Sequence, residues 1–193
     1  MKIVAISQRV DVLPERNETR DALDQRLVAL MLSLNYLTLP IPNVLAHSVA
    51  DWLAETKPDA LVLSGGNNIG ENFDRDSTER VMLEYAKCHE LPTLGICRGL
   101  QMMANWAGVE LHHTEGHVKT RHSVSGLINR EVNSFHTYSI KDCPLGFEVI
   151  ACSEDGLIEA IRHKSWPWEG WMWHPEREED FIEEDTNRIR SLF

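Results

Sequence analysis

Apolar runs alternate with segments of helical spacing along the first half of the chain. Strands are predicted where apolar residues stand together, and helices where they recur every three or four positions. The predicted strands are residues 2–6, 36–41, 59–64 and 92–96, and the predicted helices lie around residues 23–34, 45–53, 81–86 and 98–106. Strands that alternate with helices form a largely parallel sheet covered on both faces. The pattern therefore predicts an α/β fold.

The second half of the chain is richer in predicted strands, at residues 132–134, 147–152, 157–162 and 170–173. A last segment from Glu178 carries acidic residues in its first turn and arginines in its last, which suits the dipole of a closing helix. A polar loop is predicted between the first strand and the first helix, which has a candidate cap at Asn17, and residues 112–122 are predicted to be another polar loop. Without repeats or low-complexity segments, residues 1–193 are expected to form one domain.

Cys97 stands between a predicted strand and a predicted helix, in the run Gly95-Ile96-Cys97-Arg98-Gly99. A nucleophile at a tight strand-to-helix turn projects from the end of the sheet, and flanking glycines allow the crowded backbone to make that turn. The first N–H groups of the following helix then point at the reacting centre and favour a thiolate and a developing oxyanion. Cys97 is therefore a candidate covalent catalyst.

A cysteine nucleophile needs a base, and the base needs a partner that sets its tautomer. His174-Pro175-Glu176 offers both, because in an extended segment His174 and Glu176 project to the same side. His174 is predicted to be the base and Glu176 its orienting partner.

Two backbone donors and one amide are expected around the thiol. The oxyanion could be held by the N–H groups of Arg98, directly after the nucleophile, and of Gly66, at the end of a neighbouring strand. Gln101 lies one helical turn beyond Cys97, so its amide could bond a substrate held over the thiol.

Charge and cysteine content narrow the class of protein. The chain has 30 acidic and 19 basic residues, a net charge of −11, which argues against nucleic acid or an anionic membrane as a partner. No apolar run approaches membrane-spanning length. The four cysteines, at 88, 97, 143 and 152, lack CxxC spacing and the density of a secreted scaffold. A cytoplasmic protein is expected.

Three separated pieces of the sequence together resemble the class I glutamine amidotransferase family in type and order. They are Leu63-Ser64-Gly65-Gly66, Gly95 to Gln101, and His174-Pro175-Glu176. The resemblance implies a flavodoxin-like three-layer α/β sandwich with a mostly parallel central sheet, and a triad of Cys97, His174 and Glu176 that cleaves a γ-glutamyl amide through a thioester. One departure is that Asn67-Asn68 follows Gly66 where many members continue with Pro-Gly, so the donor loop could be shaped differently.

The same resemblance implies the substrate contacts. Gly66 and Arg98 fall on the oxyanion donors, and the glutamyl head group would be held by Gln101 and by the backbone at Asn68, Phe135 and Thr137. His136 could touch substrate or hydrogen-bond within its strand.

Arg98 after the nucleophile is similar to the free-standing γ-glutamyl hydrolase branch, which includes γ-glutamyl-γ-aminobutyrate hydrolase. Within that branch, Ser7-Gln8-Arg9, residues 133–136 and residues 172–178 resemble the small hydrolases of γ-glutamyl-CDP-amidate. This resemblance implies that Arg9 could receive a phosphate or nucleotide, although a surface ion pair is the usual role of a lone arginine.

The predicted reaction is cysteine-dependent hydrolysis of a small γ-glutamyl amide, with no cofactor, by a chain that could form a homodimer. One alternative is a glutaminase subunit that supplies ammonia to a partner synthetase. Another is a non-catalytic redox sensor on the same fold, with Cys97 as the oxidised residue. No metal site is predicted, because His112, His113, His117 and His122 lie in a polar segment without a cysteine cluster or an H-E-x-x-H helix.

Overall fold

The apolar strands of the first half lie side by side and form one half of a single sheet. The structure is a computed structural model that describes residues 1–193. Five parallel strands occur in the order β4 (Tyr36–Pro40), β1 (Lys2–Ile6), β5 (Ala60–Leu63), β6 (Thr93–Ile96) and β13 (Trp168–Trp171). β5 and β6 are buried throughout, as expected of parallel strands covered on both faces.

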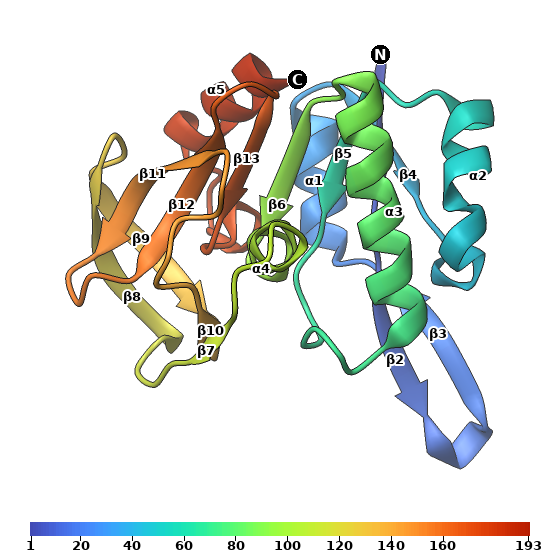
Figure 1. Ribbon diagram of the computed structural model, residues 1–193, viewed down its shortest axis with the longest axis horizontal. Coiled ribbons are helices and arrows are strands. Elements are labelled where there is room, and N and C mark those ends of the chain that lie inside the picture. Colours follow the sequence, from blue (N-terminus) through green and yellow to red (C-terminus); the bar gives the residue numbers. More distant parts are fainter.

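Four antiparallel strands from the second half extend this sheet beyond β13 (Figure 1). They are β12 (Ile158–His163), β11 (Phe147–Ser153), β8 (Val118–Gly126) and β9 (Arg130–Phe135). A separate small sheet pairs β7 (His112–His113) with β10 (Tyr138–Ser139). The result is one nine-stranded mixed sheet whose parallel half carries the nucleophile.

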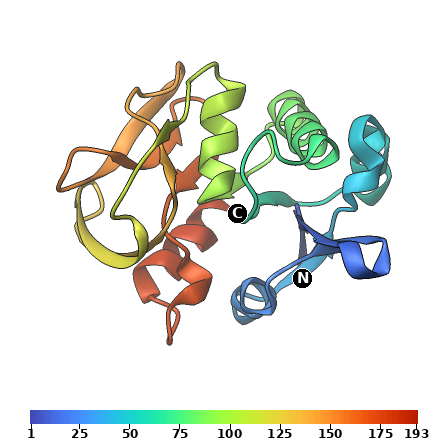
Figure 2. The same ribbon diagram turned by 90° about the horizontal axis from the view of Figure 1, so that it is seen from below.

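Helices cover both faces of the sheet, so the predicted three-layer sandwich is confirmed (Figure 2). One layer holds α2 (Val49–Thr56), α3 (Phe73–His89) and α4 (Arg98–Trp106), and the other holds α1 (Gln25–Ser33) and α5 (Glu183–Leu192). Two separate apolar clusters, one on each face, fill the spaces between sheet and helices. No helix combines the length and apolar character needed to span a membrane.

The region between β1 and α1 differs from the predicted polar loop. It forms a hairpin of β2 (Arg9–Leu13) and β3 (Glu18–Ala22), joined by the 3-10 turn Pro14–Arg16. Asn17 does not cap α1: it adopts φ 51° in the hairpin turn. The cap is Asp24, whose side chain accepts a hydrogen bond from the Arg26 N–H at 2.9 Å. The hairpin is mostly exposed, so its strands lack an apolar face that the sequence pattern could reveal.

The segment around residues 112–122, expected to be a loop, is also largely strand. β8 begins at Val118, and a bulge at Lys119, with φ 54°, interrupts its register against β9. A bulge inserts one residue and breaks the alternation of inward and outward side chains, which hides a strand from periodicity. Helix ends also shift: α3 already begins at Phe73, and α5 begins only at Glu183. A 3-10 helix, Asn43–Ser48, precedes α2.

Candidate active site

Cys97 occupies a strained strand-to-helix turn between β6 and α4. Its backbone has φ 51° and ψ −100°, a conformation that non-glycine residues rarely adopt. The two flanking glycines make the close crossing possible: a Cβ at Gly99 would lie 2.2 Å from the Leu63 carbonyl oxygen, and one at Gly95 2.6 Å from Gly99. The Cys97 N–H donates to the Trp171 carbonyl at 2.6 Å, which ties the turn to β13.

His174 and Glu176 form the closest histidine–carboxylate contact in the protein. His174 Nδ1 lies 2.6 Å from Glu176 Oε1, and both side chains are almost fully buried. The connecting backbone is not extended as predicted: Pro175–Arg177 form the 3-10 helix η3 directly after His174. This turn brings the carboxylate back over the imidazole. Because Nδ1 faces the carboxylate, Nε2 is the nitrogen left for the thiol side.

Two residues that the sequence did not single out hold His174 in place. Asn133 on β9 brackets its backbone, with Nδ2 donating to the His174 carbonyl at 2.8 Å and Oδ1 accepting from the His174 N–H at 2.9 Å. Gly65 leaves room for the ring, since a Cβ there would lie 2.7 Å from His174 Cε1. The histidine is therefore positioned from β9 and from the turn after β5.

Electrostatics favour a charged imidazolium at His174. Burial opposes the charged form, but the adjacent Cys97 sulfur and the Glu176 carboxylate outweigh it and raise the pKa of His174 to about 9. At neutral pH His174 is then biased toward the charged imidazolium form. This is the form in which the histidine beside an attacking cysteine later donates a proton.

A polar cavity of about 230 Å³ brings most of the predicted site residues together. Its lining includes Gly66, Asn68, Cys97, Arg98, Gln101, Phe135, His136, Thr137 and His174. Glu176 lies behind His174 and lines a neighbouring cavity of about 240 Å³ instead. Residues from four separate stretches of the chain thus meet around one thiol.

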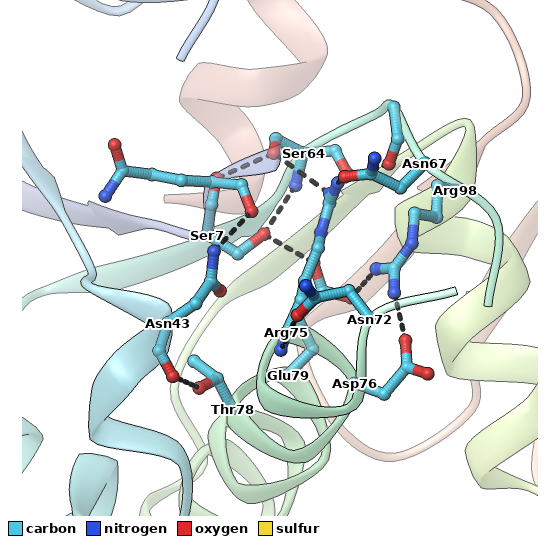
Figure 3. Close-up of polar contacts among 12 residues, drawn as sticks. Ser7, Asn43, Ser64, Asn67, Asn72, Arg75, Asp76, Thr78, Glu79 and Arg98 are labelled. Carbon is cyan, nitrogen blue, oxygen red and sulfur yellow. Dashed lines mark hydrogen bonds and ion pairs between the residues drawn. The ribbon is translucent and has the colours of Figure 1, made fainter. Parts of the chain in front are cut away.

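The loop that would present the Gly66 N–H is held by the buried side chain of Arg75 on α3 (Figure 3). Arg75 Nη2 donates to the carbonyl oxygens of Ser64 at 2.8 Å and Gly65 at 3.0 Å, and Nη1 donates to that of Gly66. In a trans peptide the N–H points opposite to the C=O. Binding of the Gly65 carbonyl therefore turns the Gly66 N–H away from Arg75, and Gly66 lines the cavity beside Cys97.

Asn67 completes this loop. It adopts φ 56°, a left-handed conformation that asparagine tolerates. Its Oδ1 accepts from the Val10 N–H at 2.8 Å and its Nδ2 donates to the Val10 carbonyl at 3.0 Å. The Asn67-Asn68 departure is thus accommodated by side-chain bonds to β2.

The Arg98 side chain points away from the cavity into the same buried network. Its guanidinium pairs with Glu79 and Asp76 on α3, and Glu79 also accepts from Ser7 Oγ at 2.7 Å and from Arg75 Nε at 3.1 Å. Burial favours the neutral carboxyl, but Arg98 and Arg75 outweigh it and lower the pKa of Glu79. Only the backbone of Arg98 is left to face a substrate.

Three predicted substrate contacts have neighbours that the sequence did not suggest. Gln101 Nε2 already donates to the Tyr138 carbonyl at 2.9 Å, which orients the amide. His136 Nδ1 lies 3.1 Å from the same carbonyl, and its Nε2 lies 3.3 Å from Glu159 Oε1. Arg9 is half exposed, pairs with Asp11 at 2.8 Å, and lines the cavity next to Glu176 and not the one that contains Cys97.

Arg177 is a candidate anion ligand that sequence reasoning missed. Its side chain lines both cavities and is about one third exposed, and its guanidinium lies 4.6 Å from the Phe135 ring centroid. Its position directly after the His-Pro-Glu run was the available signal.

The fold and the site define an α/β enzyme with a cysteine at a strand-to-helix elbow and a histidine–glutamate pair beside it. The sequence model of the glutamine amidotransferase class-I family matches residues 18–183. The chain therefore belongs to the class I glutamine amidotransferase family and is an enzyme of the amidohydrolase type.

Named relatives agree with this assignment, and a solved structure has the same fold. The chain is 31% identical to the gamma-glutamyl-CDP-amidate hydrolase of Campylobacter jejuni, over 91% of this chain and 90% of that protein. It is also 31% identical to a glutamine-hydrolyzing GMP synthase subunit of Methanobrevibacter smithii, over 75% and 77% of the two chains. The crystal structure of a glutamine amidotransferase from Thermotoga maritima aligns with a TM-score of 0.67 at 17% identity, over 98% of this chain and 81% of that one.

Proposed function

We propose that the chain hydrolyses a γ-glutamyl amide through a glutamyl thioester on Cys97. The observation that carries the proposal is the 2.6 Å contact between His174 and Glu176. His174 lines the same cavity as Cys97. A redox sensor would need neither an oriented base nor a held donor loop, so these features count against the non-catalytic alternative.

In the first half-reaction the Cys97 thiolate attacks the γ-carbonyl carbon and the carbonyl oxygen becomes an oxyanion. The backbone N–H groups of Gly66 and Arg98 stabilise that oxyanion. His174 gives its proton to the leaving nitrogen, the C–N bond breaks, and the glutamyl group remains on sulfur as a thioester.

In the second half-reaction neutral His174 takes a proton from water, which attacks the thioester carbon. The C–S bond breaks, glutamate leaves, and the thiolate–imidazolium pair is restored. Asn68, Gln101, Phe135 and Thr137 line the cavity and are the proposed contacts of the glutamyl head group.

The leaving portion of the substrate is proposed to carry a phosphate, as in a nucleotide-linked amidate. The support is the similarity to a gamma-glutamyl-CDP-amidate hydrolase together with Arg177, which borders both cavities. A planar guanidinium suits a phosphate because it donates two parallel hydrogen bonds. Arg9 is a weaker contributor, since Asp11 already pairs with it.

A reducing compartment such as the cytoplasm would keep Cys97 active as a thiol.

The test is to incubate purified protein with a panel of γ-glutamyl conjugates, including nucleotide-linked amidates, and to measure glutamate release and the mass of the protein. We expect a nucleotide-linked conjugate to be consumed and a glutamyl adduct on Cys97 to be trapped by acid quenching. Cys97→Ala should fold normally and lose both signals, whereas Cys88→Ala, at an exposed cysteine, should keep them. Wild-type turnover by Cys97→Ala would overturn the mechanism.

A glutaminase subunit is the second candidate, favoured by the relatives that are glutamine-hydrolyzing subunits of GMP synthase. Free glutamine in the same panel separates the two. Strong turnover of glutamine that rises further with an added synthetase would favour the glutaminase over the conjugate hydrolase. Rapid turnover of a conjugate but not of glutamine would exclude the glutaminase.

A further inference from the structure

Four buried side chains of the antiparallel half meet near the tip of the β11–β12 hairpin. They are His117, His122, His136 and Glu159. One carboxylate oxygen, Oε1 of Glu159, lies 3.5 Å from His117 Nδ1, 3.5 Å from His122 Nε2 and 3.3 Å from His136 Nε2. The four side chains are 7%, 15%, 1% and 1% exposed in that order.

The atoms that face one another in this histidine cluster make no hydrogen bonds. His117 Nδ1, His122 Nε2, His136 Nε2 and both oxygens of Glu159 are all buried and unpartnered. Buried polar atoms are nearly always paired, because an unpaired one costs the free energy of its lost hydration. Five such atoms on four neighbouring side chains indicate that a charged group belongs among them.

Hydrogen bonds made by the outer ring nitrogens of His136 and His117 fix the tautomers of these two histidines. His136 Nδ1 lies 3.1 Å from the Tyr138 carbonyl oxygen, which can only accept, so this nitrogen carries the proton. His117 Nε2 lies 3.0 Å from the Asp155 carboxylate and carries the proton for the same reason. In the neutral rings the inner nitrogens are therefore lone pairs that point at a carboxylate.

A proton alone does not resolve this arrangement. A proton on His122 Nε2 would give Glu159 one charged partner, 3.5 Å away. That would still leave the inner lone pairs of His117 and His136 opposite Glu159. A single cation at the centre satisfies all of these atoms at once.

We propose that His117, His136 and Glu159 bind one divalent transition-metal ion, with zinc as the best fit, and that His122, 3.5 Å from Glu159 Oε1 but outside the compact group of the other three, shifts inward as the fourth ligand. Zinc takes four nitrogen and oxygen ligands in a tetrahedron at about 2.0–2.1 Å, which places neighbouring ligand atoms roughly 3.3–3.4 Å apart. The three distances to Glu159 Oε1 are close to that spacing, and the inner atoms of His117, His136 and Glu159 all lie within 4.8 Å of one another.

The surroundings are those that metal-bound histidines need. A ligating histidine usually donates its other N–H to a carboxylate or backbone carbonyl, which fixes the ring and its tautomer. Asp155 and the Tyr138 carbonyl occupy these positions for His117 and His136. A separate cavity of about 250 Å³, lined by His117 and His122, gives an ion access from outside.

The bulge in β8 explains how two of the ligands face the same way. His117 and His122 are an odd number of positions apart, so in a regular strand they would point to opposite faces. The extra residue at Lys119 restores the parity. The ion would thus join β8, β12 and the segment after β9, whose Phe135 and Thr137 flank His136 and line the cavity with Cys97.

The experiment uses the full chain without an affinity tag, purified from cells grown with zinc, manganese and iron added. Bound metals are measured by mass spectrometry, then removed with a chelator, and zinc is titrated back by calorimetry. We expect about one zinc per chain and one strong site in the titration. Removal should lower the midpoint of thermal unfolding by at least about 5 °C, and zinc should restore it.

Matched variants locate the ion. His117→Gln and Glu159→Gln should hold less than a tenth of the wild-type metal and show no zinc-dependent change in the unfolding midpoint. His113→Gln, at an exposed histidine of the same segment, should bind as wild type. The proposal is overturned if the purified chain carries no transition metal and the metal-free chain takes up none, or if both cluster variants keep the wild-type stoichiometry.

Discussion

Two buried glutamates, Glu79 on α3 and Glu159 on β12, have opposite surroundings. Both residues are 0% exposed. Glu79 is bonded by Arg75, Arg98 and Ser7, whereas neither oxygen of Glu159 has a hydrogen-bond partner within the chain. The first carboxylate is neutralised by the protein's own cations. The second faces only imidazoles.

This difference predicts that the stability of the two halves of the sheet depends differently on a bound cation. The Glu79 network lies beside the donor loop, and in it both buried guanidinium groups are paired with carboxylates of the chain itself (Figure 3). A buried charge that lacks a full counter-charge costs several kcal/mol, so on the proposed assignment the Glu159 cluster is most stable when a cation joins it. The catalytic half should therefore be insensitive to chelators and the antiparallel half sensitive to them.

The largest effect is expected from Glu79→Gln, which keeps the shape of the side chain and removes its charge. Arg75 then loses its counter-charge and Arg98 keeps only Asp76, so we expect unfolding in urea to become easier by about 3–5 kcal/mol. The loss should be the same with and without chelator. Glu55→Gln, at an exposed position on α2, serves as the control and should change stability little. A loss below about 1 kcal/mol would mean that the network is not a stabilising unit.

Arg75→Lys tests whether the same network also controls catalysis. Lysine keeps the charge but cannot bond three successive carbonyls, so the Gly66 N–H would lose its fixed direction. We expect kcat to fall by about 10²–10³, the cost of one lost oxyanion donor, with a smaller change in KM. Arg80→Lys, on the exposed face of α3, should leave kcat unchanged. Steady-state kinetics on the folded fraction distinguishes this effect from simple loss of protein, and an unchanged kcat would contradict the role of Arg75.

Glu159→Gln should behave in the opposite way to Glu79→Gln. In the presence of chelator we expect it to be as stable as the metal-free wild type or more so, because a repulsive buried charge is gone. With zinc at 100-fold above its dissociation constant the wild type should gain about 2.7 kcal/mol and the variant nothing. Urea denaturation with and without zinc gives both values, and Glu110→Gln is an exposed control. If Glu79→Gln and Glu159→Gln lost the same stability in the presence of chelator, the predicted difference between the two glutamates would be wrong.

The smallest effect concerns the histidine–carboxylate contact of the catalytic half, His174 with Glu176. His174 must be protonated to donate to the leaving nitrogen, and its raised pKa of about 9 keeps it so at neutral pH. Activity should therefore fall as the pH rises through about 9, by roughly tenfold per unit beyond it. Glu176→Gln removes one cause of the raised pKa, so its kcat/KM should begin to fall at a lower pH. Profiles that coincide would contradict the pairing.

The parallel half of the fold was largely predictable from the sequence, and the antiparallel half less so. β5 and β6 are short, mostly apolar runs, because strands buried on both faces need no polar side, and β1 and β4 are also mostly apolar. The β2–β3 hairpin and β8 are exposed or bulged, so their patterns carry no clear period. Both were expected to be loops for that reason.

The candidate site shows the same division. Cys97, His174 and Glu176 stand in short runs whose spacing is meaningful by itself, so they could be proposed before any coordinates. Arg75 and Asn133 were missed because an arginine in a helix and an asparagine in a strand are ordinary residues until their partners are known. His117 and His122 were set aside as ligands because no cysteine cluster or H-E-x-x-H helix accompanies them, and Glu159 is too remote in sequence to suggest that it lies beside them.

The amino-acid sequence by itself determined the family, the α/β layering and the identity of the nucleophile, since all three depend on local patterns of apolar residues and glycines. Only the tertiary structure decided which buried charges are paired. That outcome depends on contacts between residues far apart in the chain, where the loss of hydration must be offset atom by atom. Glu79 and Glu159 are the same residue type, and only their neighbours in space make one a structural counter-ion and the other a proposed metal ligand.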